Sequence, residues 1–324
     1  MTDARPPILL LGPISPRVGE RLAAAGFPTV RASTADPALL PAEAASVRGV
    51  AVHGAAPARL MQALPQLEIV ASFGVGYDAV DAGHAAKSGI VVTHTPDVLN
   101  EEVADTAIAL LLNTLRELPQ AETWLRAGRW AKEGPYRLSP LTLRGRTVGL
   151  YGLGRIGMAI ARRLEAFGVG IEYHTRSVRA GVPWRHHPTL LSLARSVDTL
   201  VVIVPGTAET RHSVDAEVLE ALGATGVLVN VGRGSTVDEA ALIDALSRGV
   251  IAGAGLDVFD DEPRVPEALI ALPNVSLLPH VGSASVATRA AMADLVADNL
   301  VAWFDRGHAL TPVPETPFAR KAAG

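Results

Sequence analysis

Three short segments in the second half of the sequence carry residue types suited to acid–base chemistry. Arg233 lies in LVNVGRGSTVDE, Glu262 in GLDVFDDEP and His280 in LLPHVGSAS. A histidine can give or take a proton near neutral pH, a carboxylate can orient it, and an arginine can bind an anion. Each alone has an ordinary alternative: a solvated loop arginine, a turn-capping carboxylate or a structural histidine. All three follow apolar runs, where ligands bind in open α/β sheets, and this shared position favours one site.

A glycine-rich turn adds a second kind of chemistry. Gly152, Gly154 and Gly157 form G-x-G-x-x-G directly after the apolar run Thr147–Leu150, and the helix-forming segment MAIARRLEAFG follows. The glycines allow a tight turn, close approach of a pyrophosphate and packing of helix on strand. The N-terminus of the helix adds N–H groups and a positive dipole end. The pattern predicts a dinucleotide site made of Gly152, Leu153, Gly154, Arg155, Ile156 and Gly157, and a glycine turn without a ligand is the alternative.

The segment after the next apolar run, GIEYHTRS, bears on which dinucleotide binds. An NAD site usually ends this strand with an acidic residue that accepts hydrogen bonds from the ribose hydroxyls. Here Thr175, Arg176 and Ser177 stand there instead. Arginine offers donors that match a 2′-phosphate, and the two hydroxyl groups add further donors. The segment therefore predicts a preference for NADP(H), with NAD as the other cofactor considered, and a solvated basic loop is the structural alternative.

Alternating strands and helices must position these residues. Nearly continuous apolar runs, typical of parallel strands buried on both faces, occur at 8–11, 49–52, 68–72, 90–93, 147–151, 170–174, 199–204, 226–231, 253–258 and 275–278. Helical spacing appears between many of them, for example at Met158–Phe167 and Glu239–Arg248. The class is therefore α/β, with two doubly wound parallel-sheet domains.

The chain organisation follows from two helices. The segment 100–119 reads as one long helix that begins at Asn100 and stops at Pro119, and it crosses between the two groups of strands. The last helix, 284–306, returns to the first group. We therefore expect a Rossmann cofactor domain at 99–286, inserted into a flavodoxin-like substrate domain of residues 1–98 plus 287–324. The Pro-rich tail TPVPETPFARKAAG is expected to be loose.

Composition narrows the function classes. The 324 residues carry a net charge of −4, which argues against a general surface for nucleic acid or anionic membranes. The sequence contains no cysteine, which excludes disulfides, thiolate metal ligands and a cysteine nucleophile, and no metal site is expected. The N-terminal apolar run is too short for a signal peptide, and the segment 104–115 is too short and polar to span a bilayer. These observations favour a cytoplasmic protein.

The motifs together resemble those of the D-isomer-specific 2-hydroxyacid dehydrogenases, and more narrowly of the glyoxylate/hydroxypyruvate reductases. The resemblance extends over nearly the whole chain and rests on the segments LPQLEIVASFGVGYDAVD, GIVVTHTPDVLNEEVADTAIALLL, LRGRTVGLYGLGRIG, VIVPGTAET, LVNVGRGSTVDE, GLDVFDDEP and LLPHVGSAS. It implies that Arg233, Glu262 and His280 are the catalytic set. His280 would then protonate the carbonyl oxygen of a 2-keto acid, Glu262 would bind the other ring nitrogen, and Arg233 would hold the carboxylate and the developing alkoxide.

The resemblance also implies roles for further residues. The backbone N–H groups of Val75 and Gly76 would bind the substrate carboxylate, with an ordinary glycine turn as the alternative. The remaining implied cofactor-binding residues are Val204, Pro205, Thr210, Val231, Asp257 and Gly282, with Asp257 near the nicotinamide amide and ribose. His53 either faces the expected cleft between the domains or is a plain strand-end histidine. Trp130 either reaches a neighbouring subunit's site or belongs to a core or an interface.

The expected function is NADPH-dependent reduction of glyoxylate to glycolate and of hydroxypyruvate to D-glycerate by a homodimer. One alternative is an NAD-dependent dehydrogenase for a larger 2-keto acid. Another is a non-catalytic dinucleotide-sensing protein of the same fold. The intact set of Arg233, Glu262 and His280 favours an enzyme over the sensor.

Overall fold

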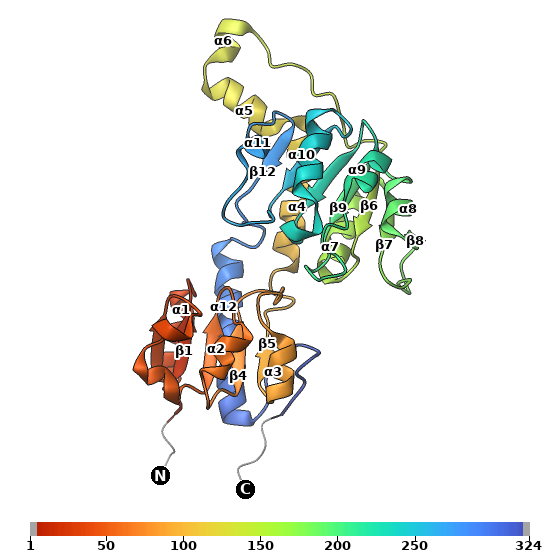
Figure 1. Ribbon diagram of the computed structural model, residues 1–324. Coiled ribbons are helices and arrows are strands. Elements are labelled where there is room, and N and C mark those ends of the chain that lie inside the picture. The colour runs from red at the N-terminus through yellow and green to blue at the C-terminus, as the bar shows by residue number, and fades with distance from the viewer. Residues whose placement is uncertain (1–4, 320–324) are drawn as a thin grey trace. The chain divides into compact units, whose positions relative to one another are not determined.

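Two sheets of parallel strands form the centres of two units, as the apolar runs predict (Figure 1). The structure is a computed structural model, and it describes residues 5–319. One unit comprises the described residues up to Leu99 and those from Ala284 onward, and the other is Asn100–Ser283. The domain boundaries expected from the sequence, after residues 98 and 286, lie one and three residues from these.

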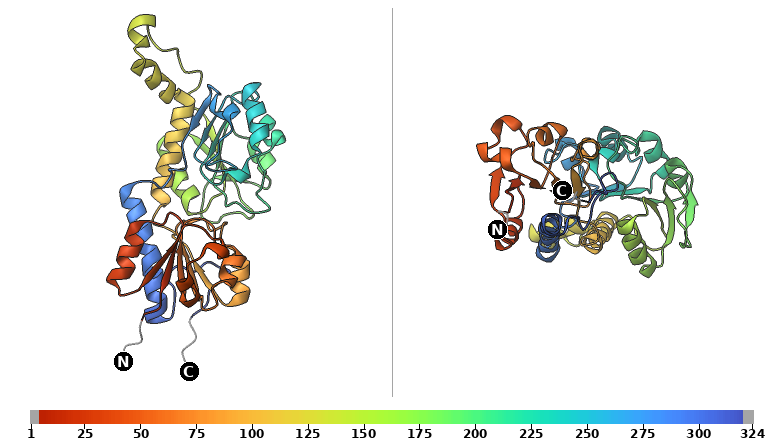
Figure 2. Two further views of the ribbon diagram at one scale, coloured as in Figure 1. Left: turned by 60° about the vertical axis from the view of Figure 1, so that its left-hand side comes forward. Right: turned by 90° about the horizontal axis from the view of Figure 1, so that it is seen from below.

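The first unit is built on five parallel strands in the order β2-β1-β3-β4-β5. This 2-1-3-4-5 order is that of flavodoxin-like sheets. Helix α1 packs with α12 on one face, and α2 and α3 lie on the other (Figure 2). The elements are β1 (Ile8–Leu11), α1 (Pro16–Ala24), β2 (Thr29–Ala32), η1 (Pro37–Leu39), η2 (Ala42–Ser46), β3 (Gly49–Val52), α2 (Ala58–Gln62), β4 (Ile69–Ser72), α3 (Ala82–Ser88), β5 (Val91–Thr93) and α12 (Val286–Arg306).

The second unit contains seven parallel strands in the order β12-β11-β10-β9-β6-β7-β8. The order extends the Rossmann arrangement by one strand, and it reverses between β6 and β9, where such sheets bind their ligands. Helices α4 and α7 pack together, and α9 packs against both α8 and α10. The elements are α4 (Asn100–Arg116), α5 (Leu118–Arg126), α6 (Arg129–Glu133), β6 (Thr147–Tyr151), α7 (Arg155–Ala166), β7 (Gly170–His174), β8 (Arg185–His187), α8 (Leu190–Ala194), β9 (Thr199–Val202), α9 (Ala216–Leu222), β10 (Val227–Asn230), η3 (Gly234–Thr236), α10 (Glu239–Ser247), β11 (Gly253–Leu256), α11 (Glu267–Ile270) and β12 (Val275–Leu277).

Burial explains why the sequence predicts the central strands correctly. Every residue of β1, β3, β4, β9, β10 and β11 is buried, because helices cover both faces of each sheet. Removal of this apolar surface from water is the main term that stabilises both sheets. Because β6, β9, β10 and β11 are neighbouring parallel strands, their carboxyl ends lie at one edge of the second sheet. These ends carry the loops of the candidate site.

Three details differ from the sequence-based expectations. Two edge strands, β2 and β8, were not predicted. The expected helix at 100–119 ends at Arg116, because Glu117 adopts a left-handed conformation (φ 51°), and Pro119 then lies in the first turn of α5 instead of ending α4. The described part of the tail expected to be loose is packed: Val313 and Thr316 are fully buried, and Pro312 pairs with Thr93 in an antiparallel bridge. Residues 320–324 of that tail lie outside the described residues.

Candidate active site

Of the three motif glycines in the turn after β6, only Gly154 would have open space around an added Cβ. A Cβ on Gly152 would lie 2.7 Å from the carbonyl oxygen of Ile203, and one on Gly157 would lie 2.5 Å from the carbonyl oxygen of Gly152. These two glycines are therefore needed for packing of the chain. A Cβ on Gly154 would meet no atom within 4 Å. Gly154 also precedes α7, and no side chain caps this helix, so the N-terminus of α7 could hold the pyrophosphate of a dinucleotide.

The loop after β9 closes on itself beside this turn. The Thr210 hydroxyl donates to the carbonyl oxygen of Pro205 (2.7 Å) and accepts the N–H of Thr207 (2.8 Å). A Cβ on Gly152 would lie 3.0 Å from Cγ1 of Val204, so the glycine turn and this loop are in contact. Val231 is buried after β10, and its N–H donates to the carbonyl oxygen of Val202. The predicted cofactor-flanking residues thus line the point where the strand order reverses.

The loop after β7 presents a positive charge and no carboxylate. The Thr175 hydroxyl donates to the carbonyl oxygen of Ser177 (2.7 Å), which closes a tight turn with the Arg176 side chain exposed. A hydrogen bond with Thr207 holds the pKa of Glu209 below its usual range, and the positive charge of Arg176 acts in the same direction. The charge of Arg176 therefore acts on the loop after β9.

The loop that carries Arg233 is held in place by the buried side-chain amide of Asn230, a residue that the sequence analysis did not predict. Asn230 ends β10 and is fully buried; its Nδ2 donates to the carbonyl oxygen of Arg233 (2.9 Å), and its Oδ1 accepts the N–H of Gly232 (3.0 Å). A Cβ on Gly234 would lie 1.8 Å from the carbonyl carbon of Phe259, so the Arg233 loop and the Glu262 loop are in close backbone contact. The only sequence signal for this role is an asparagine at the end of an otherwise apolar run.

Glu262 and His280 form a direct pair. The Nδ1 atom of His280 lies 2.7 Å from Oε2 of Glu262, and Oε1 accepts the backbone N–H of Phe259 at 3.0 Å. Burial opposes ionisation of Glu262, but the hydrogen bond from His280, the bond from Phe259 and the charges of His280 and Arg233 outweigh it, so the pKa of Glu262 is lowered. Since a carboxylate only accepts, His280 donates through Nδ1, which leaves Nε2 as its second ring nitrogen for exchange of a proton.

Asp257 holds the loop that carries His280. Its Oδ1 accepts the N–H of Val281 (2.7 Å), its Oδ2 accepts the N–H of Gly282 (2.8 Å), and its carbonyl oxygen accepts the N–H of His280 (2.9 Å). These bonds stabilise the left-handed conformation of His280 (φ 52°), which few residues other than glycine adopt. Burial raises the pKa of Asp257 although the two N–H groups favour its charged form. Both carboxylate oxygens are therefore engaged within the protein rather than directed only to a nicotinamide or ribose.

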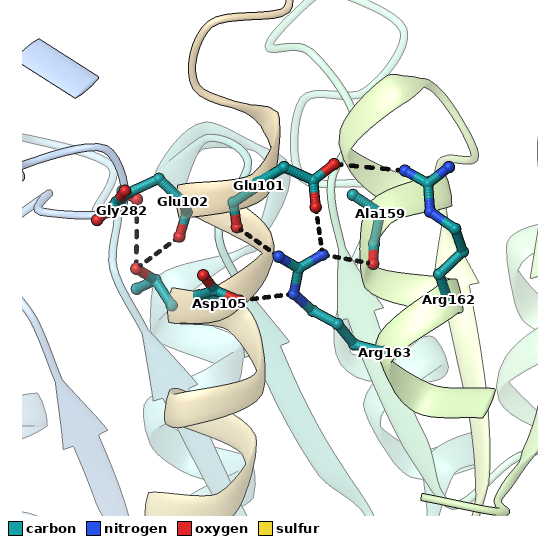
Figure 3. Close-up of polar contacts among 8 residues, drawn as sticks. Glu101, Glu102, Asp105, Ala159, Arg162, Arg163 and Gly282 are labelled. Atoms are coloured by element: carbon teal, nitrogen blue, oxygen red, sulfur yellow. Dashed lines mark hydrogen bonds and ion pairs between the residues drawn. The ribbon is translucent and has the colours of Figure 1, made fainter. Parts of the chain in front are cut away.

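The start of α4 contacts both the loop that carries His280 and helix α7, which follows the glycine turn (Figure 3). Arg163 of α7 bonds the side chains of Asp105 (Nε to Oδ1, 2.6 Å) and Glu101 (Nη1 to Oε2, 2.7 Å) on α4. From the same turn of α4, the Thr106 hydroxyl donates to the carbonyl oxygen of Gly282 at 3.2 Å. One helix end thus fixes both the predicted cofactor helix and the loop that carries His280.

The remaining predicted residues lie elsewhere in the chain. In the first unit, Val75 and Gly76 follow β4, and His53 follows β3 with its ring 5.1 Å from that of Phe73. In the second unit, Trp130 lies on α6 and is 61% exposed, so it is not a core residue of this chain. Within residues 5–319 no group of three or more histidine, aspartate or glutamate side chains could hold a metal ion. In the same range, every helix is too short or too polar to cross a membrane.

Comparison with known proteins places this geometry in a family. Residues 108–282 match the NAD-binding domain of D-isomer specific 2-hydroxyacid dehydrogenases. Glyoxylate/hydroxypyruvate reductase A HPR2 of Arabidopsis thaliana is 52% identical over 270 residues, which cover 83% of this chain and 86% of that relative. Hydroxyphenylpyruvate reductase of Plectranthus scutellarioides is 48% identical over 273 residues, covering 84% and 87%.

Among solved structures, an NADPH-dependent glyoxylate/hydroxypyruvate reductase from Sinorhizobium meliloti, in complex with NADP and malonate, is 68% identical. The two structures superpose with a TM-score of 0.97 over 98% of this chain and 100% of that one. The matched domain contains the glycine turn and the loops of Arg233, Glu262 and His280. The chain therefore belongs to the D-isomer specific 2-hydroxyacid dehydrogenase family.

Proposed function

We propose that this protein is an NADPH-preferring reductase of small 2-keto acids, which converts glyoxylate to glycolate and hydroxypyruvate to D-glycerate. The observation that carries the proposal is the 2.7 Å pair of His280 and Glu262, with the charge of Arg233 acting on the same carboxylate. This set lies in the same unit as the glycine turn. The names of the Arabidopsis and Sinorhizobium relatives support the choice of substrates.

Bound NADPH supplies the hydride that reaches the carbonyl carbon of the substrate. The protein supplies the proton and the electrostatic stabilisation. His280 in its charged form donates a proton from Nε2 to the carbonyl oxygen, and Glu262 keeps the ring oriented through Nδ1. Arg233 binds the substrate anion and stabilises the charge that develops on the oxygen. The backbone N–H groups of Val75 and Gly76 bind the substrate carboxylate. In the reverse direction neutral His280 takes the proton back.

The loop after β7 supports NADPH over NADH. This loop contains one guanidinium and two hydroxyl groups, from Arg176, Thr175 and Ser177. NAD sites usually have a ribose-binding carboxylate at this position, which would repel a 2′-phosphate, and these three residues include no acidic group. The bound NADP of the 68% identical relative supports the same choice. NADH remains the alternative cofactor.

A homodimer is part of the proposal, and α5 and α6 would supply much of its interface. These helices and their flanking segments expose large apolar side chains: Leu118, Leu125, Trp130 and Leu138. Exposed apolar groups concentrated in one segment are typical of a protein–protein contact. A cytoplasmic location is the remaining part of the proposal, and it fits a sequence without cysteine.

Steady-state oxidation of NADPH and of NADH with glyoxylate, hydroxypyruvate and 4-hydroxyphenylpyruvate tests the proposal. We expect turnover with the two small acids and higher kcat/KM with NADPH. The hydroxyphenylpyruvate reductase at 48% identity makes a larger 2-keto acid the second candidate, and faster turnover of the aromatic acid would favour it. Cofactor binding without turnover of any of the three acids would favour a dinucleotide sensor.

A further inference from the structure

Two consecutive carbonyl groups of the loop after β4 are held by the chain that follows β5. The carbonyl oxygen of Gly74 accepts the backbone N–H of Thr95 at 2.8 Å. The carbonyl oxygen of Val75 lies 2.7 Å from Nδ1 of His94. A carbonyl oxygen only accepts hydrogen bonds, so the proton on His94 is assigned to Nδ1. All four residues belong to the first unit.

These two bonds determine where two N–H groups point. A trans peptide is planar, and its C=O and N–H are directed to opposite sides. The peptide whose carbonyl is that of Gly74 carries the N–H of Val75, and the next one carries the N–H of Gly76. Holding both carbonyls toward the chain after β5 therefore directs both N–H groups away from it. Within residues 5–319, neither N–H donates to another group of the protein, so both are available to an anion.

His94 is itself held on two sides. Its backbone N–H donates to the carbonyl oxygen of Thr311 (3.3 Å), and its carbonyl oxygen accepts the Thr311 hydroxyl (2.6 Å). Asn299 of α12 fixes Thr311 in turn, since its Nδ2 donates to that hydroxyl oxygen at 2.9 Å. The ring of Tyr77 packs edge-on against the His94 ring, with centroids 5.4 Å apart.

The C-terminal segment also reaches the loop directly. The N–H of Val313 donates to the carbonyl oxygen of Val92 (2.9 Å), and the Thr316 hydroxyl accepts the N–H of Val92 (2.9 Å), so the segment runs along β5. From this segment, the carboxylate of Glu315 accepts the Tyr77 hydroxyl at 3.1 Å. Burial and the neighbouring Glu315 carboxylate raise the pKa of Tyr77 to about 12, so the phenol remains a donor across the neutral range.

We propose that His94 is a positioning residue for the substrate carboxylate, and that the segment Thr311–Thr316 holds it in place. His94 fixes the peptide that carries the Gly76 N–H, and Thr95 fixes the one before it. An N–H group that is oriented before the substrate arrives needs no reorganisation on binding. A hydrogen bond to the carbonyl of the same peptide group also polarises that N–H. This inference rests on the proposed binding of the 2-keto acid carboxylate by Val75 and Gly76.

The test compares His94→Asn with His94→Leu. The two new side chains have nearly the same shape, but asparagine has an N–H donor at the δ position and leucine has none. We expect KM for glyoxylate to rise about tenfold in His94→Leu, the effect of losing about one hydrogen bond, and to stay near the wild-type value in His94→Asn. The NADPH dissociation constant, from fluorescence, and the Tm should be the same in both variants. Tyr77→Phe should raise KM less than His94→Leu does. The control is Tyr136→Phe, which removes a similar hydroxyl–glutamate bond elsewhere in the chain (Tyr136 to Glu117, 3.0 Å) and should leave KM unchanged.

Equal KM values for the asparagine and leucine variants would overturn the inference, and so would an equal loss of NADPH affinity in His94→Leu. Calorimetric titration of malonate, a dicarboxylate probe, into the NADPH complex keeps the two proposals separable. If the wild-type protein turned over no 2-keto acid, the proposed function would fail. The malonate affinities of the two variants would still show whether His94 positions a carboxylate site: weaker binding only in His94→Leu would support it, and equal affinities would refute it.

Discussion

Asp257 and Gly282 are joined by a 2.8 Å hydrogen bond between a buried carboxylate oxygen and a backbone N–H, although 25 residues separate them. The other oxygen of Asp257 accepts the N–H of Val281 in the same way. A carboxylate can serve two N–H groups at once, whereas an asparagine has one oxygen and would turn its NH2 against the second N–H. The two bonds therefore require the charged side chain, and they fix the loop that begins with His280.

From this relationship we predict that Asp257→Asn lowers kcat for glyoxylate by at least about tenfold, since one buried N–H loses its acceptor, with a smaller effect on the NADPH dissociation constant. Stopped-flow kinetics and fluorescence titration separate the two quantities. Asp215→Asn is the matched control, because Asp215 caps α9 through the N–H of Val218 and asparagine caps a helix equally well. A larger loss in NADPH affinity than in kcat would instead assign Asp257 to direct cofactor binding.

Glu262 should affect both catalysis and the pH dependence of stability. We expect Glu262→Gln to lower kcat by about 100-fold, the lower range for acid–base groups, because a neutral amide supports the charged His280 ring poorly. The lowered pKa of Glu262 means that its stabilising contribution is present above the unfolded-state pKa of about 4.3 and is lost as pH falls through the native value. Denaturant unfolding of wild type and variant should therefore differ at pH 7 and converge in acid. A difference that stays constant as the pH is lowered into the acid-unfolding range would contradict this.

The charge of Arg176 should determine the choice between cofactors. Arg176→Asp should weaken NADPH binding by about tenfold or more, since a charge-assisted hydrogen bond contributes about 1.5–3 kcal/mol, and should leave NADH binding nearly unchanged. Glu209→Gln should strengthen NADPH binding, because it removes a negative charge that interacts electrostatically with Arg176. Dissociation constants for both cofactors, measured at two salt concentrations, check the pair. Parallel effects on NADH and NADPH would show that Arg176 does not bind the 2′-phosphate.

The glycine turn offers a test that separates binding from folding. Gly154→Ala places a methyl group in open space within this chain, so we expect an unchanged Tm and a much weaker NADPH complex. Gly157→Ala places the same group 2.5 Å from the carbonyl oxygen of Gly152, so we expect a lower Tm even without cofactor. Differential scanning fluorimetry with and without NADPH measures both. An unchanged cofactor affinity in Gly154→Ala would place the pyrophosphate elsewhere.

The sequence determined the central parts of the fold by itself. Parallel strands covered on both faces are buried at every position, so continuous apolar runs such as ILLL at β1 and GVAV at β3 identify them locally. The glycine turn is equally local, because its three glycines and the adjoining strand and helix are contiguous in the chain. The edge strand β8, with the sequence RHH, escaped prediction because an exposed edge carries no such pattern.

The tertiary structure alone decided how distant segments hold the site. Nothing near Asp257 in the sequence reveals that Val281 and Gly282 are its partners, and nothing near His94 reveals Val75 or Thr311. The prolines and polar residues of the tail resemble a linker and therefore predict a loose segment, yet the N–H of Val313 and the hydroxyl of Thr316 find partners on β5. Such hydrogen bonds depend on which distant segments the order of strands in the sheet places side by side. A local sequence pattern carries no information about that order.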